Sequence, residues 1–299
     1  MPDFFDPQVI GRIKNLEVRS LRLVESFMAG MHKSRLLGIS TEFAQHRQYV
    51  PGDDVKHLDW KVFAKTDRYY VKQYEAETNM QLTFLLDTSN SMFFKSEQAG
   101  LSKFDYAATV VSALAYMLLQ QKDTFGLMLF DEDVSSVLRP RGAGSHFRNV
   151  ISALEGARPT GKTSLSNSMF AMTSRLKRRG LVVVVSDLVD EVDQLGLALG
   201  QLSFSGHDVI LFHIEDPIER DFPFTGQTIF LGLEEEGKLL CEPRDLRNAY
   251  LAERRNHLEN CRGACLRFGY DFEDMFTDTR LDATLAGFLS LRLARKQVR

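Results

Sequence analysis

The chain has 299 residues, 44% of them hydrophobic, and a formal net charge of −3. These values suit a globular protein with a core of ordinary size, and they give no global basic field that would argue for nucleic-acid binding. No apolar run is long enough to span a bilayer, and the N-terminus lacks a signal peptide's basic start and apolar middle. We therefore expect a cytoplasmic protein. Three cysteines, an odd number, fit reduced thiols rather than a disulfide framework.

The N-terminal region divides into a helical part and a loop-rich part. Apolar residues at helical spacing predict one or two amphipathic helices that pack on the neighbouring domain: Val9, Ile10, Ile13, Leu16, Leu21, Leu23, Val24 and Phe27. Residues 32–78 are dense in charge and predict short strands and loops, one of them over Tyr69–Tyr74. We expect residues 1–80 to form a smaller N-terminal segment ahead of an α/β domain over residues 81–299.

A group of acids and one histidine in the loop-rich part invites a metal or catalytic interpretation. These residues are Asp53, Asp54, His57 and Asp59. Basic residues, including Arg47 and Arg68, surround them, and mixed-sign clusters usually neutralise themselves. We therefore favour a structural role, with an interaction surface as the functional alternative and catalysis behind it.

The stretch Leu82–Met92 organises the rest of the chain. An apolar run suited to a buried parallel strand ends in Asp87, followed at alternate positions by Ser89 and Ser91. One carboxylate and two hydroxyls suit a hard, oxygen-seeking cation such as Mg²⁺. The same residue types commonly cap the next helix, so this stretch leaves both interpretations open.

Strands and helices alternate after this stretch. Strands are predicted over Thr124–Phe130, Val134–Leu138, Leu181–Asp187, Val209–His213 and Tyr270–Thr277, and helices over Phe104–Gln121, Phe147–Leu154, Leu165–Arg178, Val192–Leu202, Pro243–Arg267 and Asp282–Arg295. Repeated alternation of this kind indicates right-handed crossovers and a mostly parallel sheet. A hairpin insertion is predicted near residues 226–242, with Gly237 in its turn.

A second apolar strand, Leu181–Asp187, also ends in an aspartate. Because parallel strands open at the same edge of a sheet, we expect the carboxylates of Asp87 and Asp187 to meet in one crevice. Between them in sequence, the loop at Thr163 leads into a helix from the same side, and its hydroxyl is a further candidate ligand, with Thr160 as the nearby alternative.

His257, Cys261 and Cys265 follow one another at four-residue spacing on a predicted helix. A neighbouring pair could hold one metal ion, but the three together span about 12 Å at the rise of a helix. We interpret the thiols as partly buried structural residues.

The pattern Asp-x-Ser-x-Ser, a loop threonine and a strand-end aspartate resembles the metal-ion-dependent adhesion site of von Willebrand factor A domains. The resemblance implies a three-layer, Rossmann-like α/β fold and a bound Mg²⁺, or Mn²⁺ or Ca²⁺. It also implies a ligand set: Asp87, Ser89, Ser91, Thr163 and Asp187. In that family the serines typically bind the ion directly and the two aspartates often act through waters. Leu188 stands where the family usually has glycine.

The N-terminal block narrows the resemblance. Its motifs are Gly38-x-Ser40-x-Glu42-Phe43, Arg47-x-Tyr49-x-Pro51-Gly52-Asp53-Asp54 and Asp59-Trp60. Together with the later motifs they resemble a bacterial family catalogued as domain of unknown function fifty-eight, whose members are often encoded with MoxR-type AAA+ ATPases. The resemblance implies an adaptor or chaperone partner of such an ATPase, which would offer an acidic side chain to the metal.

The leading interpretation is therefore a non-enzymatic, metal-dependent protein-binding module. A first alternative is a Mg²⁺-dependent phosphatase of the haloacid dehalogenase type, with Asp87 as nucleophile. Those enzymes typically place a general acid two residues later, where this chain has Ser89. A second alternative keeps the fold but makes the metal site structural or vacant.

Overall fold

The computed structural model describes residues 5–31, 43–48, 62–63, 68–74, 81–159, 161, 164–176, 178–189, 191–233, 237–287 and 289. The chain divides into two compact units, one made of Met1–Lys33 with Met80–Arg299 and one of Ser34–Asn79. This division differs from the predicted boundary near residue 80, since the first 33 residues group with the α/β domain.

The larger unit is built on a six-stranded sheet in the order β10-β7-β6-β3-β4-β5. Its strands are β3 (Gln81–Asp87), β4 (Thr124–Phe130), β5 (Val134–Arg141), β6 (Leu181–Ser186), β7 (Asp208–Glu215) and β10 (Asp271–Phe276). All neighbouring pairs are parallel except β4–β5, which is antiparallel. Counted along the chain, the order is 3-2-1-4-5-6, as in doubly wound folds that bind ligands where the strand order reverses.

Burial follows from the composition of the strands. In β6 every residue is buried, and β3 and β4 are buried after their first residue, because both of their faces are covered. The edge strand β5 alternates between half-buried and exposed residues, as expected for a strand with one solvent-facing side. The predicted central strands are confirmed, and the predicted edge strand extends to Arg141.

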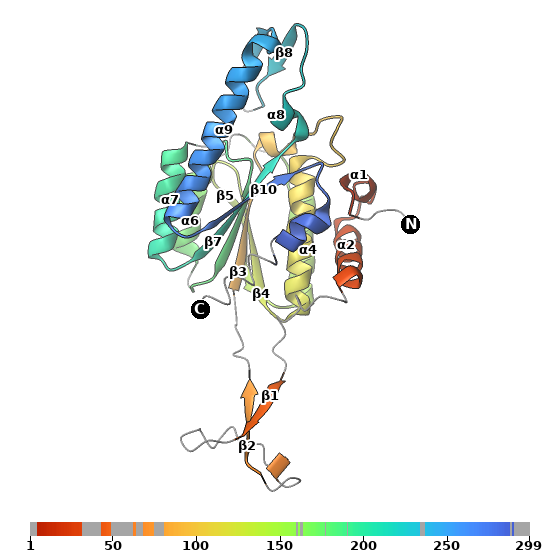
Figure 1. Ribbon diagram of the computed structural model, residues 1–299, viewed down its shortest axis with the longest axis vertical. Helices are drawn as coiled ribbons and strands as arrows, with labels where there is room; N and C mark the ends of the chain where they lie inside the picture. Colours follow the sequence, from red (N-terminus) through yellow and green to blue (C-terminus); the bar gives the residue numbers. More distant parts are fainter. Residues whose placement is uncertain are drawn as a thin grey trace. The chain divides into compact units, whose positions relative to one another are not determined.

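Helices cover both faces of the sheet (Figure 1). One layer holds α4 (Lys103–Gln120) and α5 (Gly144–Gly156); the other holds α6 (Leu165–Arg175), α7 (Val192–Phe204) and α9 (Pro243–Arg267). A helix over residues 281–287 closes the described chain, and most of the predicted remainder to Arg295 lies outside the described residues. The three-layer α/β prediction is confirmed.

A small lobe continues from the end of β7. It contains α8 (Pro217–Asp221) and the antiparallel hairpin of β8 (Thr228–Leu231) and β9 (Lys238–Cys241), which precedes α9. The predicted hairpin is confirmed, and Gly237 has the positive φ of 87° that its turn requires. The ring of Phe230 in the hairpin packs with those of Phe222 and Phe224, and the Phe222 ring packs in turn with that of Tyr250.

The N-terminal helices belong to the α/β unit because they dock on α4. They are α1 (Pro7–Ile10) and α2 (Leu16–Met31). The buried guanidinium of Arg19 donates from Nη1 to Thr109 Oγ1 at 3.0 Å and from Nη2 to the Ile13 carbonyl at 2.8 Å. Ser20 Oγ lies 2.5 Å from Ser112 Oγ. The predicted packing of this region on the neighbouring domain is confirmed.

The smaller unit holds the antiparallel pair β1 (Phe43–Gln48) and β2 (Tyr70–Tyr74). The rings of Phe63 and Tyr69 stack with centroids 4.5 Å apart. The predicted short strand over Tyr69–Tyr74 is confirmed. Asp53, Asp54, His57, Asp59 and Trp60 lie outside the described residues, so their predicted roles remain predictions.

No helix within the described part of the chain combines the length and the apolar character that a bilayer crossing requires.

Replacing Arg19 by Met should destabilise the protein, because the charge-assisted hydrogen bonds to Thr109 of α4 and to the Ile13 carbonyl disappear while the apolar stem remains. We expect the free energy of unfolding to fall by about 2 kcal/mol in urea denaturation. The exposed Arg22 on the same helix offers the matched control, and Arg22→Met should be nearly neutral. Equal stabilities of the two variants would contradict this account of docking.

Candidate metal site at the rim of the sheet

The two predicted acids lie at the point where the strand order reverses. Asp87 ends β3 and Asp187 directly follows β6, and these strands pair in parallel at the centre of the sheet. The last paired residues of the two strands are Leu86 and Val185, so both acids lie within two residues of the same end of the pairing. The predicted convergence at one rim is thus what the strand pairing produces.

Asp87 is fully buried and held on both oxygens. Oδ1 accepts a hydrogen bond from the Ser89 amide at 2.8 Å, and Oδ2 accepts one from Ser186 Oγ at 2.6 Å. Burial and the charge of Asp187 raise the pKa of Asp87 to about 7, against the opposing effect of these hydrogen bonds. The carboxylate therefore sits where a nearby cation would stabilise it.

The serines after β3 do not serve as helix caps. The short 3-10 helix η3 (Asn90–Phe93) begins after Ser89, whose side chain makes no capping bond. The next helix, α4, is capped by Ser102, whose Oγ accepts from the Asp105 amide at 3.0 Å. Ser89 Oγ and Ser91 Oγ instead lie 3.1 Å apart, buried at the rim. The capped-turn interpretation therefore accounts for the contact of the Ser89 amide with Asp87 but not for the two hydroxyls, which lie beside the aspartates: Ser89 helps to lower the pKa of Asp87, and Ser91 that of Asp187.

Asp187 is bound by a lysine that sequence reasoning missed. Lys103 Nζ donates to Asp187 Oδ2 at 2.9 Å and to Glu219 Oε1 at 2.7 Å, and the Lys103 residue is only 1% exposed. Burial would raise the pKa of Asp187, but Lys103, with the neighbouring Ser91 hydroxyl, lowers it below its ordinary value. Asp187 is therefore ionised at neutral pH.

The other oxygen of Asp187 is the feature that fits a cation. Oδ1 is buried, and no group among the described residues donates a hydrogen bond to it. A buried, unpaired carboxylate oxygen is costly unless a cation satisfies it. With Asp87, Ser89 and Ser91 it forms an all-oxygen donor set of the kind that Mg²⁺ and Mn²⁺ prefer. The residues therefore fit the predicted ion.

The contribution of the predicted loop threonine is untested. Thr163 and Thr160 lie outside the described residues. Gly161, a described residue, does reach this rim, since the Asn90 amide donates to its carbonyl at 3.2 Å. Within the described residues, no three His, Cys, Asp or Glu side chains gather as a metal cluster, so a site at this rim depends on hydroxyl ligands.

Leu188, at the position where a glycine was expected, adopts a left-handed φ of 57°. This conformation costs roughly 1–3 kcal/mol for a residue other than glycine. Three local contacts hold it: the buried side chain, a bond from the Leu188 amide to Ser186 Oγ at 3.0 Å, and a bond from His257 Nε2 to the Leu188 carbonyl at 2.8 Å. The turn that a glycine would permit is thus kept by packing.

His257 and its neighbouring cysteines play a structural part. His257 is engaged with Leu188, and Cys261 Sγ lies 3.6 Å from His257 Nε2. Cys261 and Cys265 are free thiols of α9, as predicted, and they are fully rather than partly buried in the core.

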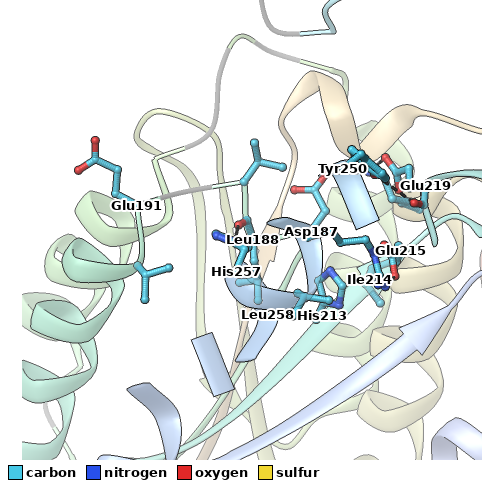
Figure 2. Close-up of a pocket in the computed structure, with 14 residues that line it drawn as sticks. Asp187, Leu188, Glu191, His213, Ile214, Glu215, Glu219, Tyr250, His257 and Leu258 are labelled. Atoms are coloured by element: carbon cyan, nitrogen blue, oxygen red, sulfur yellow. Dashed lines mark hydrogen bonds and ion pairs between the residues drawn. The ribbon is translucent and has the colours of Figure 1, made fainter. Parts of the chain in front are cut away.

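A pocket of about 610 Å³ opens beside Asp187, between the ends of β6 and β7 and helix α9. Figure 2 shows Asp187 between Leu188 and His257 on one side and Glu219 and Tyr250 on the other. Its charged lining is mixed but mainly acidic, namely Lys103, Asp187, Glu191, Glu215, Glu219 and Arg254. Glu215 and Arg254 pair with each other within it. The pocket therefore borders Asp187, whereas Asp87, Ser89 and Ser91 are not among its lining residues.

The raised pKa of Asp87 predicts a pH dependence for the metal-free protein. Between about pH 4 and about pH 7, Asp87 holds a proton in the folded state that it releases in the unfolded state. The free energy of unfolding should therefore fall as pH rises through this range. The lowered pKa of Asp187 acts below this window. In EDTA, Asp87→Asn should flatten the fall and stabilise the protein at pH 8 by on the order of 1–4 kcal/mol.

Urea denaturation between pH 5 and 8 measures this effect, with Glu132→Gln, an exposed acid after β4, as control. A metal-free protein whose free energy of unfolding rises between pH 5 and about 7 would contradict the electrostatics described.

Comparison with known proteins agrees with this architecture. An aerotolerance-related membrane protein from Bacteroides fragilis, solved with multiple mutations to serines, shares 16% identity at a TM-score of 0.50, with 71% of this chain and 98% of that chain covered. The VWA domain of SpRpn10 is similar at 14% identity and a TM-score of 0.43, covering 69% and 93%. The likeness to the Bacteroides fragilis structure agrees with the three-layer α/β fold and the strand order described above.

The sequence relatives and a family model each match most of the chain. Uncharacterized proteins from Mycobacterium bovis and Mycobacterium tuberculosis are each 23% identical over 235 residues, which cover 78% of this chain and 73% of theirs. The family described as "Protein of unknown function DUF58" matches residues 45–260. This protein is a member of the DUF58 family.

Proposed function

We propose that this protein is a non-catalytic protein-binding module that holds a divalent cation, Mg²⁺ or alternatively Mn²⁺ or Ca²⁺, at the rim of its sheet. The observation that carries the proposal is the buried Asp187 Oδ1, to which no described group donates a hydrogen bond, on a carboxylate whose neighbour is the Ser91 hydroxyl. The von Willebrand factor A-like fold supports an interaction role, because its strand order places the site at an open crevice.

Each residue has a distinct task in this proposal. Ser89 and Ser91 offer neutral oxygens to the ion, while Asp87 and Asp187 supply charge directly or through water. Thr163 would add a further hydroxyl. The ion would supply an electrophilic position for a carboxylate of the partner, because neutral hydroxyl ligands do not neutralise the positive charge of the ion.

The partner that the family resemblance implies is a MoxR-type AAA+ ATPase that offers an Asp or Glu side chain. The pocket beside Asp187 supports this part of the proposal through its size and opening. Its acidic lining would disfavour a carboxylate without a metal ion, so the cation is what makes such recognition favourable.

A phosphatase role is less well supported. Both oxygens of Asp87 are engaged, by the Ser89 amide and Ser186 Oγ, and the position expected for a general acid holds Ser89. Serine cannot protonate a leaving group as a carboxylic acid does. Phosphatase assays with Mg²⁺ should therefore show no turnover, and turnover abolished by Asp87→Asn would overturn the non-catalytic assignment.

Binding to the candidate ATPase should depend on both the ion and Asp87. We expect Kd to rise at least tenfold in EDTA and in Asp87→Ala, because either change removes the electrophile that receives the partner's carboxylate. Titration of the two full-length proteins in Mg²⁺ measures this, with Glu132→Ala as the control at the same rim. Unchanged affinity under both conditions would remove the metal from the mechanism.

A further inference from the structure

Lys103 occupies an unusual place for a lysine. It is the first residue of α4, where the positive end of the helix dipole disfavours a cation, and it is almost completely buried. Burial alone would lower its pKa, but the charges of Asp187 and Glu219 reverse this effect and raise it. The ammonium is therefore retained by two acids rather than by its own helix.

Both acids bind the ammonium of Lys103 directly. Nζ lies 2.9 Å from Asp187 Oδ2 and 2.7 Å from Glu219 Oε1. Glu219 is itself fixed, because its Oε2 accepts from the Asp216 amide at 3.0 Å in the capping box of α8. Tyr250 of α9 also donates to the Glu219 carbonyl at 3.0 Å. The ammonium thus has a defined position on one oxygen of Asp187.

From this geometry we infer that Lys103 is an internal cation that sets the affinity of the rim site for divalent metal ions. The inference rests on the proposed metal site. The ammonium satisfies Asp187 Oδ2 and leaves Oδ1 for the ion, so two positive charges share one carboxylate. Their repulsion weakens metal binding, while the ammonium keeps the site folded when no ion is present.

Glu219 sets the strength of the repulsion between Lys103 and the metal ion. Its carboxylate offsets the charge of Lys103 and draws Nζ away from Asp187, which makes the rim less repulsive to a second cation. Lys103 and Glu219 are therefore positioning residues, and they act on the ion through Asp187 and through charge rather than as its ligands.

Titration calorimetry of the metal-stripped full chain with Mn²⁺ tests the inference. Lys103→Met, which keeps the apolar stem, should bind Mn²⁺ at least tenfold more tightly than the unmodified protein, or about 1.4 kcal/mol. Lys95→Met removes a charge from an exposed lysine before the same helix and should leave the affinity unchanged. In EDTA, Lys103→Met should melt below the unmodified protein, and saturating Mn²⁺ should narrow the difference.

Glu219→Gln provides an independent test that retains the lysine, and it serves if Lys103→Met does not fold. Its Mn²⁺ affinity should fall severalfold, because the charge of Lys103 then loses a counter-ion. Glu191→Gln, which alters an exposed acid of the same pocket, is the matched control and should have less effect. An affinity for Glu219→Gln equal to or tighter than that of the unmodified protein would overturn the inference.

The outcomes separate this inference from the proposed function. Equal, measurable affinities of the unmodified protein and Lys103→Met would overturn the role of Lys103 and leave the metal site standing. Mn²⁺ binding to Lys103→Met but not to the unmodified protein would support the role of Lys103 and overturn the proposed metal-dependent function. Binding by neither protein would overturn both.

Discussion

The parallel pairing of β3 with β6 is the constraint on which the rest of the rim depends. It sets two strand-end acids, Asp87 and Asp187, side by side in a region with almost no access to water. Two carboxylates in such a place repel each other and lose their hydration, so the fold must supply compensating groups. Ser186 and the Ser89 amide compensate Asp87, whereas a buried ammonium compensates Asp187.

The ion pair between Lys103 and Asp187 connects the rim to the small lobe that follows β7. Lys103 also binds Glu219, which caps α8, and Tyr250 of α9 closes over the same residue. Tyr250 packs in turn on Phe222, which stacks on Phe230 of the hairpin. The charge balance at the sheet is thus connected by direct contacts to the small lobe, where Ile229, Leu231 and Leu240 expose apolar side chains.

Much of the fold could be predicted because apolar strands and amphipathic helices alternate with strong periodicity. The strand Thr124–Phe130 and the helix Pro243–Arg267 have the predicted bounds. The meeting of Asp87 with Asp187 also followed from the sequence, since a parallel sheet opens its strand ends at one rim. The domain boundary was harder, because the apolar face of α2 predicts packing on the neighbouring domain but does not show that residues 1–33 form one compact unit with it.

Lys103 and Leu188 show where sequence reasoning stopped. The contact of Lys103 with Asp187 joins residues 84 positions apart, and no local spacing encodes it. A signal was nevertheless present, because a lysine at the first position of a helix opposes the helix dipole and calls for an acidic partner. Nothing in a leucine predicts the left-handed backbone of Leu188, which depends on tertiary contacts with Ser186 and His257.

The most direct test of the rim site is the anomalous scattering of Mn²⁺ in crystals of the full chain grown with that ion. This account predicts a peak bounded by Ser89, Ser91 and Asp187 Oδ1, at roughly 2.0–2.3 Å from the oxygens that bind it directly. A map without a peak at the junction of β3 and β6, under conditions where other sites on the protein are occupied, would contradict the account.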